Sequence, residues 1–230
     1  MIPGARRTLV IALVAFVCLA GCGSDEPQPR PQPQPVVATL GDSITAGAPR
    51  WDPNLVLRQF LPGRPTPRSQ WQYWADRATD GAFRFDNCGE IGERTDQIEL
   101  RLARCAEGAD VLVVQGGTND ITQDRAPAFA AANLREMLRR AKDAGLRTLV
   151  TTIPPINTQY PRWAQEVRRL NGLIRAIARS EGVPLVDFFA ALEDPSRPDR
   201  MPDRWTADGV HPTVAGYARL GAEAARALAP

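Results

Sequence analysis

Short runs of apolar and β-branched residues alternate with helical patterns along this chain, and this alternation limits the folds open to it. Two of the runs, DVLVVQ and RTLVTTI, are nearly continuous in such residues, as expected of strands covered on both faces. The last three of the five runs begin roughly 36 residues apart, a spacing typical of successive βα units. The predicted strands are Val36–Leu40, Phe83–Asp86, Val111–Gln115, Arg147–Ile153 and Pro184–Phe188.

Helical stripes fill the spaces between these runs. Apolar residues recur at three- and four-residue steps in NLREMLRRAKDAG, EVRRLNGLIRAIARSEG and TVAGYARLGAEAARAL. Gly145 and Gly182 stand where the first two of these helices should end. We therefore predict an α/β fold, a three-layer α/β/α sandwich with a mainly parallel five-stranded sheet. Such sheets bind their ligands beyond the carboxyl ends of the strands.

The first 21 residues do not belong to this pattern. Arg6 and Arg7 precede the apolar run Leu9–Ala20, which is shorter than the roughly 20 residues that span a bilayer and indicates a secretory signal peptide. The run leads into Leu-Ala-Gly-Cys, which resembles a bacterial lipobox, with Cys22 as the lipidated residue. A plain signal that happens to end in cysteine is the alternative. An acylated Cys22 would anchor the exported protein to a membrane on its extracytoplasmic side.

Residues 22–35 follow as a linker in which prolines alternate with polar residues. This composition favours an extended polyproline spacer between the anchor and a domain at 36–230. Without Arg6 and Arg7, the chain's 28 basic residues fall to the number of its 26 acidic ones. This balance gives no reason to expect a nucleic acid as partner.

Two cysteines remain in the predicted domain, Cys88 and Cys105. An even pair in an exported protein favours a disulfide. On the other hand, a helix between them would carry them apart at about 1.5 Å per residue, while a disulfide needs Cα atoms within about 7 Å. Both states stay open at this point. Histidines and cysteines are too few and badly spaced for a metal site, and no cofactor is predicted.

The stretch VVATLGDSITAGAP places Gly41, Asp42 and Ser43 directly after the first predicted strand. One interpretation is structural, because Asp and Ser are common helix N-caps and Gly suits a tight turn. The other makes Ser43 a nucleophile at a strand-to-helix turn. A nucleophilic serine needs a base, a group that orients the base, and donors for an oxyanion.

The chain has one histidine, His211, in the stretch TADGVHPTVAGY. Histidine is the side chain best suited to take and return the proton of a serine hydroxyl near neutral pH. Asp208 stands three residues earlier, within reach of the imidazole, and could fix its tautomer. By itself a lone histidine is more often structural.

Donors for an oxyanion occur after two other predicted strands. Asn119 in VVQGGTND and Gly92 in NCGEIGERT could offer a side-chain and a backbone N–H. Each is also explained by an ordinary turn. Because the carboxyl ends of parallel strands share one sheet edge, we expect both segments to meet Ser43 there.

The blocks GDSIT, NCGEIGERT, GGTND and DGVHP resemble, in order, the four blocks of the SGNH hydrolase family, also called GDSL esterases and lipases. The resemblance extends from Val36 to the C-terminus and implies a flavodoxin-like fold. It implies catalytic roles for Ser43 as nucleophile, His211 as base and then acid, and Asp208 as orienting acid.

The same resemblance implies an oxyanion hole made of the Ser43 and Gly92 amides and the Asn119 side chain. Gly89 competes with Gly92 for this role, and Gly92 is favoured because the family's glycine follows its asparagine, here Asn87, by five residues. Asp42 is then a structural residue that braces the turn.

The expected function is a serine ester hydrolase that cleaves small acyl or acetyl esters of glycans or lipids through an acyl-enzyme. Two alternatives stay open: an acyltransferase with the same triad, and a non-catalytic surface lipoprotein that binds a ligand. The expected partners are an ester substrate and the membrane that holds the lipid anchor. The blocks identify neither the acyl chain length nor the oligomeric state.

Overall fold

The chain folds as a parallel five-stranded sheet with helices on both faces. A computed structural model describes Met1 and residues 33–229, so the predicted signal peptide, Cys22 and most of the linker lie outside the described residues. The strand order is β2-β1-β3-β4-β5, and all neighbouring strands are parallel. The strands are β1 (Val36–Gly41), β2 (Arg84–Gly89), β3 (Val111–Val114), β4 (Arg147–Thr151) and β5 (Leu185–Val186).

The sheet confirms the predicted α/β/α sandwich, and each of the five predicted strands is present with ends shifted by a few residues. The last strand differs most, since only Leu185–Val186 pair with β4. Its chain leaves the sheet at Asp187, whose side chain caps helix α9 by accepting a hydrogen bond from the Ala190 amide (3.1 Å).

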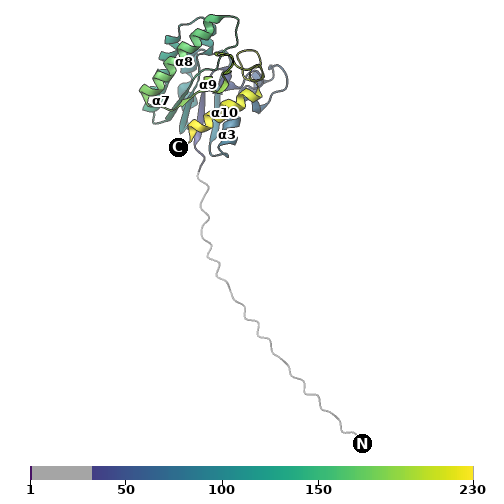
Figure 1. Ribbon diagram of the computed structural model, residues 1–230. Helices are drawn as coiled ribbons and strands as arrows, with labels where there is room; N and C mark the ends of the chain where they lie inside the picture. The colour runs from purple at the N-terminus through teal and green to yellow at the C-terminus, as the bar shows by residue number, and fades with distance from the viewer. Residues whose placement is uncertain (2–32, 230) are drawn as a thin grey trace. The chain divides into compact units, whose positions relative to one another are not determined.

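One helical layer lies on each face of the sheet. Figure 1 shows α7 and α8 side by side at one side of the domain and α3 and α10 together at another. The first layer contains α4 (Thr95–Leu100), α5 (Leu102–Ala106), α7 (Pro127–Asp143) and α8 (Pro161–Glu181). The second contains α3 (Trp71–Ala78), α9 (Phe188–Leu192) and α10 (Val214–Leu228).

Strand residues alternate between two hydrophobic clusters. In β3, Leu112 and Val114 pack into the cluster under α7 and α8, while Val111 and Val113 pack into the cluster under α3 and α10. This alternation follows from the two-residue period of a strand and explains why the run DVLVVQ is apolar throughout.

The predicted helical stripes are confirmed as core. Buried stripe residues are Leu134, Met137, Leu138 and Ala141 in α7, and Val167, Leu170, Ile174 and Ile177 in α8. Gly182 caps α8 in a left-handed conformation (φ +65°), and Gly145, with φ +84°, follows the end of α7. Both helices therefore stop where their glycines indicated.

Shorter elements stand at the carboxyl edge of the sheet. They are α1 (Ser43–Ala46), α2 (Leu55–Arg58), α6 (Thr118–Thr122) and the single turns of 3₁₀ helix Pro67–Ser69 and Asp203–Trp205. Gln34–Pro230 form one compact unit, and both clusters lie within it, so the domain can be studied without the residues before it. No helix within 33–229 is long and apolar enough to cross a membrane.

Candidate active site

Ser43 opens α1 directly after β1. Gly41, at the end of the strand, admits no side chain, because a Cβ there would overlap Thr45 and the Gln115 Oε1 atom. The Asp42 carboxylate caps α1 by accepting a hydrogen bond from an amide of its first turn. Ser43 is 3% exposed, and its amide, at the first helical position, has no acceptor within the helix.

His211 contacts both of the residues that the sequence places with it. Its Nε2 atom lies 2.9 Å from Ser43 Oγ, and its Nδ1 atom lies 2.7 Å from Asp208 Oδ2. The other carboxylate oxygen of Asp208 accepts hydrogen bonds from the amides of His211 (2.7 Å) and Val210 (2.9 Å). The structure thus joins a serine and a histidine that are 168 residues apart in the chain.

These contacts set the charge of Asp208. Partial burial raises the pKa of this carboxyl, but the hydrogen bonds from the His211 ring and amide, the ring's charge and the Val210 amide outweigh it. The pKa of Asp208 therefore lies well below its ordinary value. Asp208 is ionised wherever an imidazole can act as a base, so it can stabilise an imidazolium on His211.

A second loop holds the turn that carries Asp208 and His211. Gly209, between them, has φ +90°, and its carbonyl accepts a hydrogen bond from the Asn157 amide (2.7 Å). A Cβ on Gly209 would overlap the Asn157 carbonyl oxygen. The Asn157 side chain is itself fixed by two hydrogen bonds to the Met201 backbone (2.8 and 2.7 Å). Sequence analysis did not single out Asn157, since its role depends on the approach of two distant loops.

Asn119 lies on α6, after β3. Its Nδ2 donates a hydrogen bond to the Glu93 carbonyl (2.8 Å), which uses one of the two protons of that amide nitrogen. The next residue, Asp120, is fully buried and accepts hydrogen bonds from the Thr95 amide and hydroxyl (both 2.9 Å). The loops after β2 and β3 are therefore tied together beside Asn119.

The two candidate glycines after β2 differ in their surroundings. Gly89 is buried at the end of β2, packs against α1, and its amide donates a hydrogen bond to Asn87 Oδ1 (2.9 Å). Gly92 has φ +83° in the following turn, and a Cβ placed there would meet no atom within 4 Å. Because the Gly89 amide is already engaged, Gly92 is the better candidate for an oxyanion donor.

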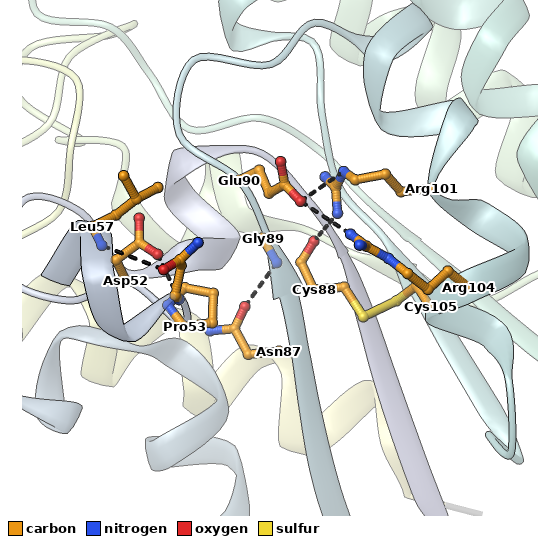
Figure 2. Close-up of a pocket in the computed structure, with 11 residues that line it drawn as sticks. Asp52, Pro53, Leu57, Asn87, Cys88, Gly89, Glu90, Arg101, Arg104 and Cys105 are labelled. Atoms are coloured by element: carbon orange, nitrogen blue, oxygen red, sulfur yellow. Dashed lines mark hydrogen bonds and ion pairs between the residues drawn. A yellow bond between two sulfur atoms is a disulfide. The ribbon is translucent and has the colours of Figure 1, made fainter.

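A cavity of about 350 Å³ lies along the carboxyl end of β2. Figure 2 shows the end of β2 between the residues of the α2 region on one side and those of α5 on the other. The cavity is lined by apolar, acidic and basic side chains. The lining residues include Asp52, Leu57, Asn87, Glu90, Arg101 and Arg104.

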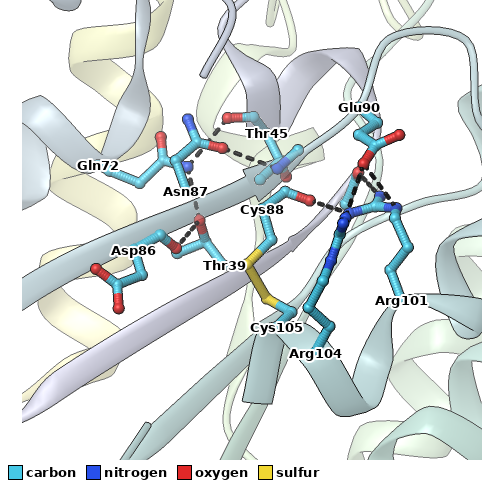
Figure 3. The surroundings of a disulfide bond; sticks show 12 residues. Thr39, Thr45, Gln72, Asp86, Asn87, Cys88, Glu90, Arg101, Arg104 and Cys105 are labelled. Carbon is cyan, nitrogen blue, oxygen red and sulfur yellow. Dashed lines mark hydrogen bonds and ion pairs between the residues drawn. A yellow bond between two sulfur atoms is a disulfide. The ribbon is translucent and has the colours of Figure 1, made fainter. Parts of the chain in front are cut away.

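Cys88 and Cys105 form a disulfide in the wall of this cavity (Figure 3). Their Cα atoms lie 6.0 Å apart although 17 positions separate them. The two cysteines are not joined by one continuous helix. The chain moves away from β2 in the loop before Thr95 and then returns through α4 and α5, which brings Cys105 back to Cys88. The open question of their state is thus answered by the course of the backbone.

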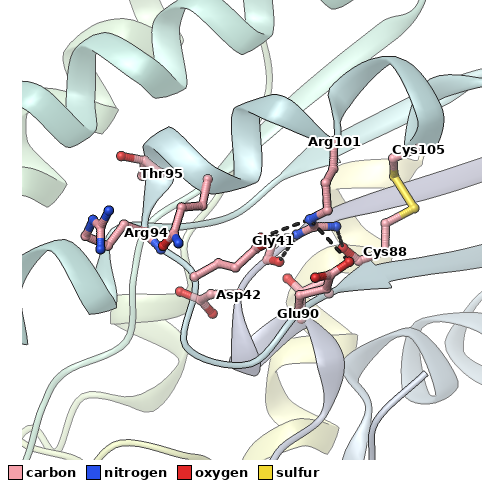
Figure 4. Close-up of polar contacts among 12 residues, drawn as sticks. Gly41, Asp42, Cys88, Glu90, Arg94, Thr95, Arg101 and Cys105 are labelled. Atoms are coloured by element: carbon pink, nitrogen blue, oxygen red, sulfur yellow. Dashed lines mark hydrogen bonds and ion pairs between the residues drawn. A yellow bond between two sulfur atoms is a disulfide. The ribbon is translucent and has the colours of Figure 1, made fainter. Parts of the chain in front are cut away.

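Arg101 lies beside the disulfide and connects three parts of the site (Figure 4). Its side chain is 11% exposed and donates hydrogen bonds to the carbonyl oxygens of Cys88 (2.6 Å) and Gly41 (3.0 Å). It also pairs with the Glu93 carboxylate (2.6 Å). One guanidinium therefore ties the strand end before Ser43 to the loop that bears Gly92.

Sequence analysis missed Arg101, and it also missed Gln115. The Gln115 Oε1 atom accepts hydrogen bonds from the Asp42 amide (3.2 Å) and the Thr45 hydroxyl (2.8 Å), which fixes the turn into α1. Neither residue belongs to a recognisable motif. Arg101 is one of 28 basic residues, and only its burial sets it apart.

Asp42 has a different environment from Asp208. Burial raises the pKa of Asp42 to about 6, against the lowering effect of the hydrogen bond from the Ile44 amide, the nearby Gln115 side chain and the charge of His211. Its Oδ2 atom is buried and has no hydrogen-bond partner. Asp42 therefore caps α1, but removing its carboxylate from water disfavours the ionised form.

Within residues 33–229, no three His, Cys, Asp or Glu side chains are grouped so that they could hold a metal ion.

Comparison with known proteins places this geometry in a family. Residues 39–219 match the sequence model of the GDSL-like Lipase/Acylhydrolase family. Among curated proteins, the chain is similar to Esterase TesA of Pseudomonas aeruginosa, with 33% identity over 110 residues. That match covers 48% of this chain and 51% of the relative, so the chain matches about half the length of this esterase.

Solved structures show the same fold at lower identity. A G-D-S-L family protein from Desulfitobacterium hafniense aligns with a TM-score of 0.68 and 16% identity, over 85% of this chain and 99% of that one. A lipolytic protein of the G-D-S-L family from Veillonella parvula aligns with a TM-score of 0.68 and 21% identity, over 84% and 97%.

The family match spans most of the chain, including the segments of Ser43, Gly92, Asn119, Asp208 and His211. The family predicted from the four sequence blocks is thus confirmed, and the match supports the expectation of an ester-bond hydrolase. The chain belongs to the GDSL-like lipase/acylhydrolase family.

Proposed function

We propose that the chain is a serine ester hydrolase that works through an acyl-enzyme on Ser43. The observation that carries this proposal is the continuous line of hydrogen bonds from Ser43 Oγ through His211 to Asp208, at 2.9 and 2.7 Å. A non-catalytic binding protein has no physical need for this alignment. The arrangement therefore favours an enzyme over a surface lipoprotein that only binds.

In the first step, Ser43 Oγ attacks the carbonyl carbon of the ester while His211 Nε2 takes the hydroxyl proton. The tetrahedral intermediate collapses when the bond to the alcohol oxygen breaks, and His211 returns its proton to that oxygen. In the second step, His211 takes a proton from water as the water attacks the acyl carbon. The bond from that carbon to Ser43 Oγ then breaks, His211 returns the proton to Ser43 Oγ, and the acid leaves. Asp208, held ionised by its hydrogen bonds, stabilises the imidazolium in both steps.

The oxyanion would be held by the amides of Ser43 and Gly92 and by the Asn119 side chain. The Ser43 amide begins a helix, the Gly92 amide lies in an open turn, and one proton of Asn119 Nδ2 is free of the bond to Glu93. Donors of this kind stabilise negative charge that develops only in the transition state.

For the substrate we propose a small acyl ester, such as an acetyl ester, of a glycan or a lipid. Ser43 is 3% exposed, and a nucleophile so covered admits a short acyl group more easily than a long chain. The proposed catalytic residues and oxyanion donors do not select the alcohol group of the ester.

We also propose that the mature protein is exported and lipid-anchored through Cys22 to a bacterial membrane or cell envelope. This proposal depends on the Leu-Ala-Gly-Cys sequence after the apolar run. Labelled palmitate should enter the wild-type protein and not the Cys22→Ala variant. Persistent labelling of that variant would contradict the anchor.

Steady-state hydrolysis of p-nitrophenyl esters, from acetate to long acyl chains, tests the activity on residues 23–230. We expect turnover that is fastest for acetate and that is lost in Ser43→Ala. A fluorophosphonate probe should label the wild type and not this variant. Labelling without hydrolysis would leave two activities, an acyltransferase and a hydrolase restricted to a glycan ester. Absence of both labelling and hydrolysis in folded protein would contradict the proposed enzyme.

A further inference from the structure

An exposed apolar and basic segment follows α1, and we call residues 50–68 the 50–68 loop. Four of the ten large hydrophobic side chains exposed in the described residues lie within six consecutive positions of this loop. They are Leu55 (70% exposed), Val56 (61%), Leu57 (49%) and Phe60 (79%). Such a concentration of apolar surface marks an interaction site more often than a scatter of single residues does.

The loop is built to keep these side chains outward. The Asn54 side chain caps α2 by accepting hydrogen bonds from two amides of its first turn (2.9 and 3.3 Å). Arg58 stacks over the Trp51 ring at 3.6 Å and donates to the Asp52 carbonyl (2.7 Å). The conformation that leaves the apolar residues at the surface is therefore held by contacts of Asn54, Arg58 and Trp51 within the loop.

The exposed charges within the loop itself have one sign. Arg50, Arg58, Arg64 and Arg68 lie in the loop, and no Asp or Glu occurs from residue 53 to residue 75. The one acid of the loop, Asp52, is buried, so it contributes little to the surface. An apolar centre with a basic rim is complementary to an anionic lipid surface, where acyl chains take the apolar residues and headgroup phosphates pair with arginine.

The 50–68 loop lies at the carboxyl edge of the sheet, although the cavity that it helps to line includes neither Ser43 nor His211. Leu57, Asp52 and Pro53 line the cavity at the carboxyl end of β2, together with Gly89 and Glu90 (Figure 2). The Glu90 amide in turn donates a hydrogen bond to the carbonyl of Gly41, two residues before Ser43 (3.0 Å). A lipid surface that contacts the loop would therefore lie against the edge of the sheet at which β1 ends before Ser43.

We propose that the 50–68 loop is a membrane-contact surface that inserts Leu55, Val56 and Phe60 into an anionic phospholipid interface. Arg64 and Arg68, two of its exposed arginines, pair with the lipid phosphates. This contact is additional to the lipid anchor proposed at Cys22, and it does not depend on ester hydrolysis. Apolar insertion and phosphate pairing should each be measurable in a chain that has no anchor.

Co-sedimentation with vesicles tests the contact on residues 23–230 with Ser43→Ala. The shortened chain lacks the proposed anchor at Cys22, and the substitution prevents turnover. We expect binding to vesicles that contain phosphatidylglycerol and about tenfold weaker binding to pure phosphatidylcholine. Adding Leu55→Ser and Phe60→Ser should weaken binding to the anionic vesicles by about tenfold or more. The matched control is Leu100→Ser, since Leu100 is 85% exposed on α4 next to Glu99, and it should bind as the parent does.

A second measurement places a probe in the interface. Phe60→Trp should add a fluorescence that brominated lipids quench, whereas Leu100→Trp should not be quenched. No binding to anionic vesicles, equal binding by the Leu55/Phe60 double variant, or no quenching at Phe60 would each overturn the proposal. When Ser43 is kept, the protein with Leu55→Ser and Phe60→Ser should still hydrolyse p-nitrophenyl acetate. Loss of membrane contact and loss of activity are therefore separate results.

Discussion

The two halves of the candidate active site are built in different ways. Asp208 and His211 lie three residues apart in one turn, and the hydrogen bonds between them involve their own side chains and amides, while Asn157 contacts only the backbone of Gly209 between them. Ser43, by contrast, depends on segments far along the chain: Gln115 fixes its turn, and Arg101 binds the carbonyl of Gly41.

The halves also differ in burial. The Asp208 side chain is 47% exposed, whereas Arg101 is 11% exposed and Asp42 is fully buried. An exposed, local group can be changed with little effect on folding, while a buried residue that joins distant segments supports both folding and catalysis. Changes in the first half should therefore reduce activity alone, and changes in the second should reduce activity and stability together.

The largest effect should come from Asp208→Asn. The remaining carbonyl oxygen can still accept the backbone bonds, but the amide nitrogen facing His211 Nδ1 would favour the wrong tautomer of the imidazole. We expect kcat to fall by about 10⁴-fold, while the free energy of unfolding falls by no more than about 1 kcal/mol, because the half-exposed carboxylate is screened by solvent. Asp203→Asn, in the same region with its side chain 83% exposed, is the control and should keep full activity. A large loss of stability in Asp208→Asn would break the contrast between the halves.

Arg101→Ala should lower both activity and stability. Loss of its bonds to Cys88 and Gly41 releases the segments that carry the proposed oxyanion donors, so kcat should fall by about 10²-fold with little change in KM. The free energy of unfolding should fall by about 3 kcal/mol, because Glu93 loses its buried partner.

Arg104→Ala is the matched control for that variant, since Arg104 lines the same cavity but is 76% exposed. Added guanidinium should restore part of kcat in Arg101→Ala and have no such effect in Arg104→Ala. An unchanged kcat in folded Arg101→Ala would show that this residue only supports the fold.

The disulfide should affect stability more than chemistry. Replacing Cys88 and Cys105 by serine opens a loop with 17 positions between its ends, and we expect the free energy of unfolding to fall by about 3 kcal/mol in urea titrations. KM should stay unchanged, because neither sulfur contacts Ser43 or His211 in the interactions described. An unchanged free energy of unfolding would mean that the packing of α4 and α5 keeps them against the sheet without the disulfide.

The smallest effect on activity should come from Asp42→Asn, which keeps an oxygen able to cap α1. Burial raises the native pKa of Asp42 to about 6, so the native state binds this proton more tightly than the unfolded chain does. The contribution of protonated Asp42 is present below about pH 4 and is lost as the pH rises through about 6.

Unfolding experiments from pH 4 to pH 8 measure this contribution. The free energy of unfolding of Asp42→Asn, measured relative to the wild type, should increase by up to about 3 kcal/mol between about pH 4 and pH 6. From there to pH 8 the difference should stay level. A difference between the two proteins that does not change with pH would show that Asp42 is not the group responsible.

Local patterns account for what was predicted correctly. The β-branched runs became strands because a strand in a covered parallel sheet needs apolar residues on both faces, and the stripes of α7 and α8 became core by the helical period. Asp208 and His211 could be paired before their geometry was known, because three residues of one turn suffice to bring them together.

The sequence by itself thus determined the layered fold, the family and the residues proposed for catalysis, since all of these are encoded in short blocks and regular periods. The state of Cys88 and Cys105 and the contacts of Arg101 were decided only by tertiary structure, which also adds a reason to prefer Gly92 to Gly89 as the proposed oxyanion donor. Each depends on how segments from different parts of the chain approach one another. Burial turns an ordinary arginine into a link between strand ends, and burial is a property of the folded chain as a whole.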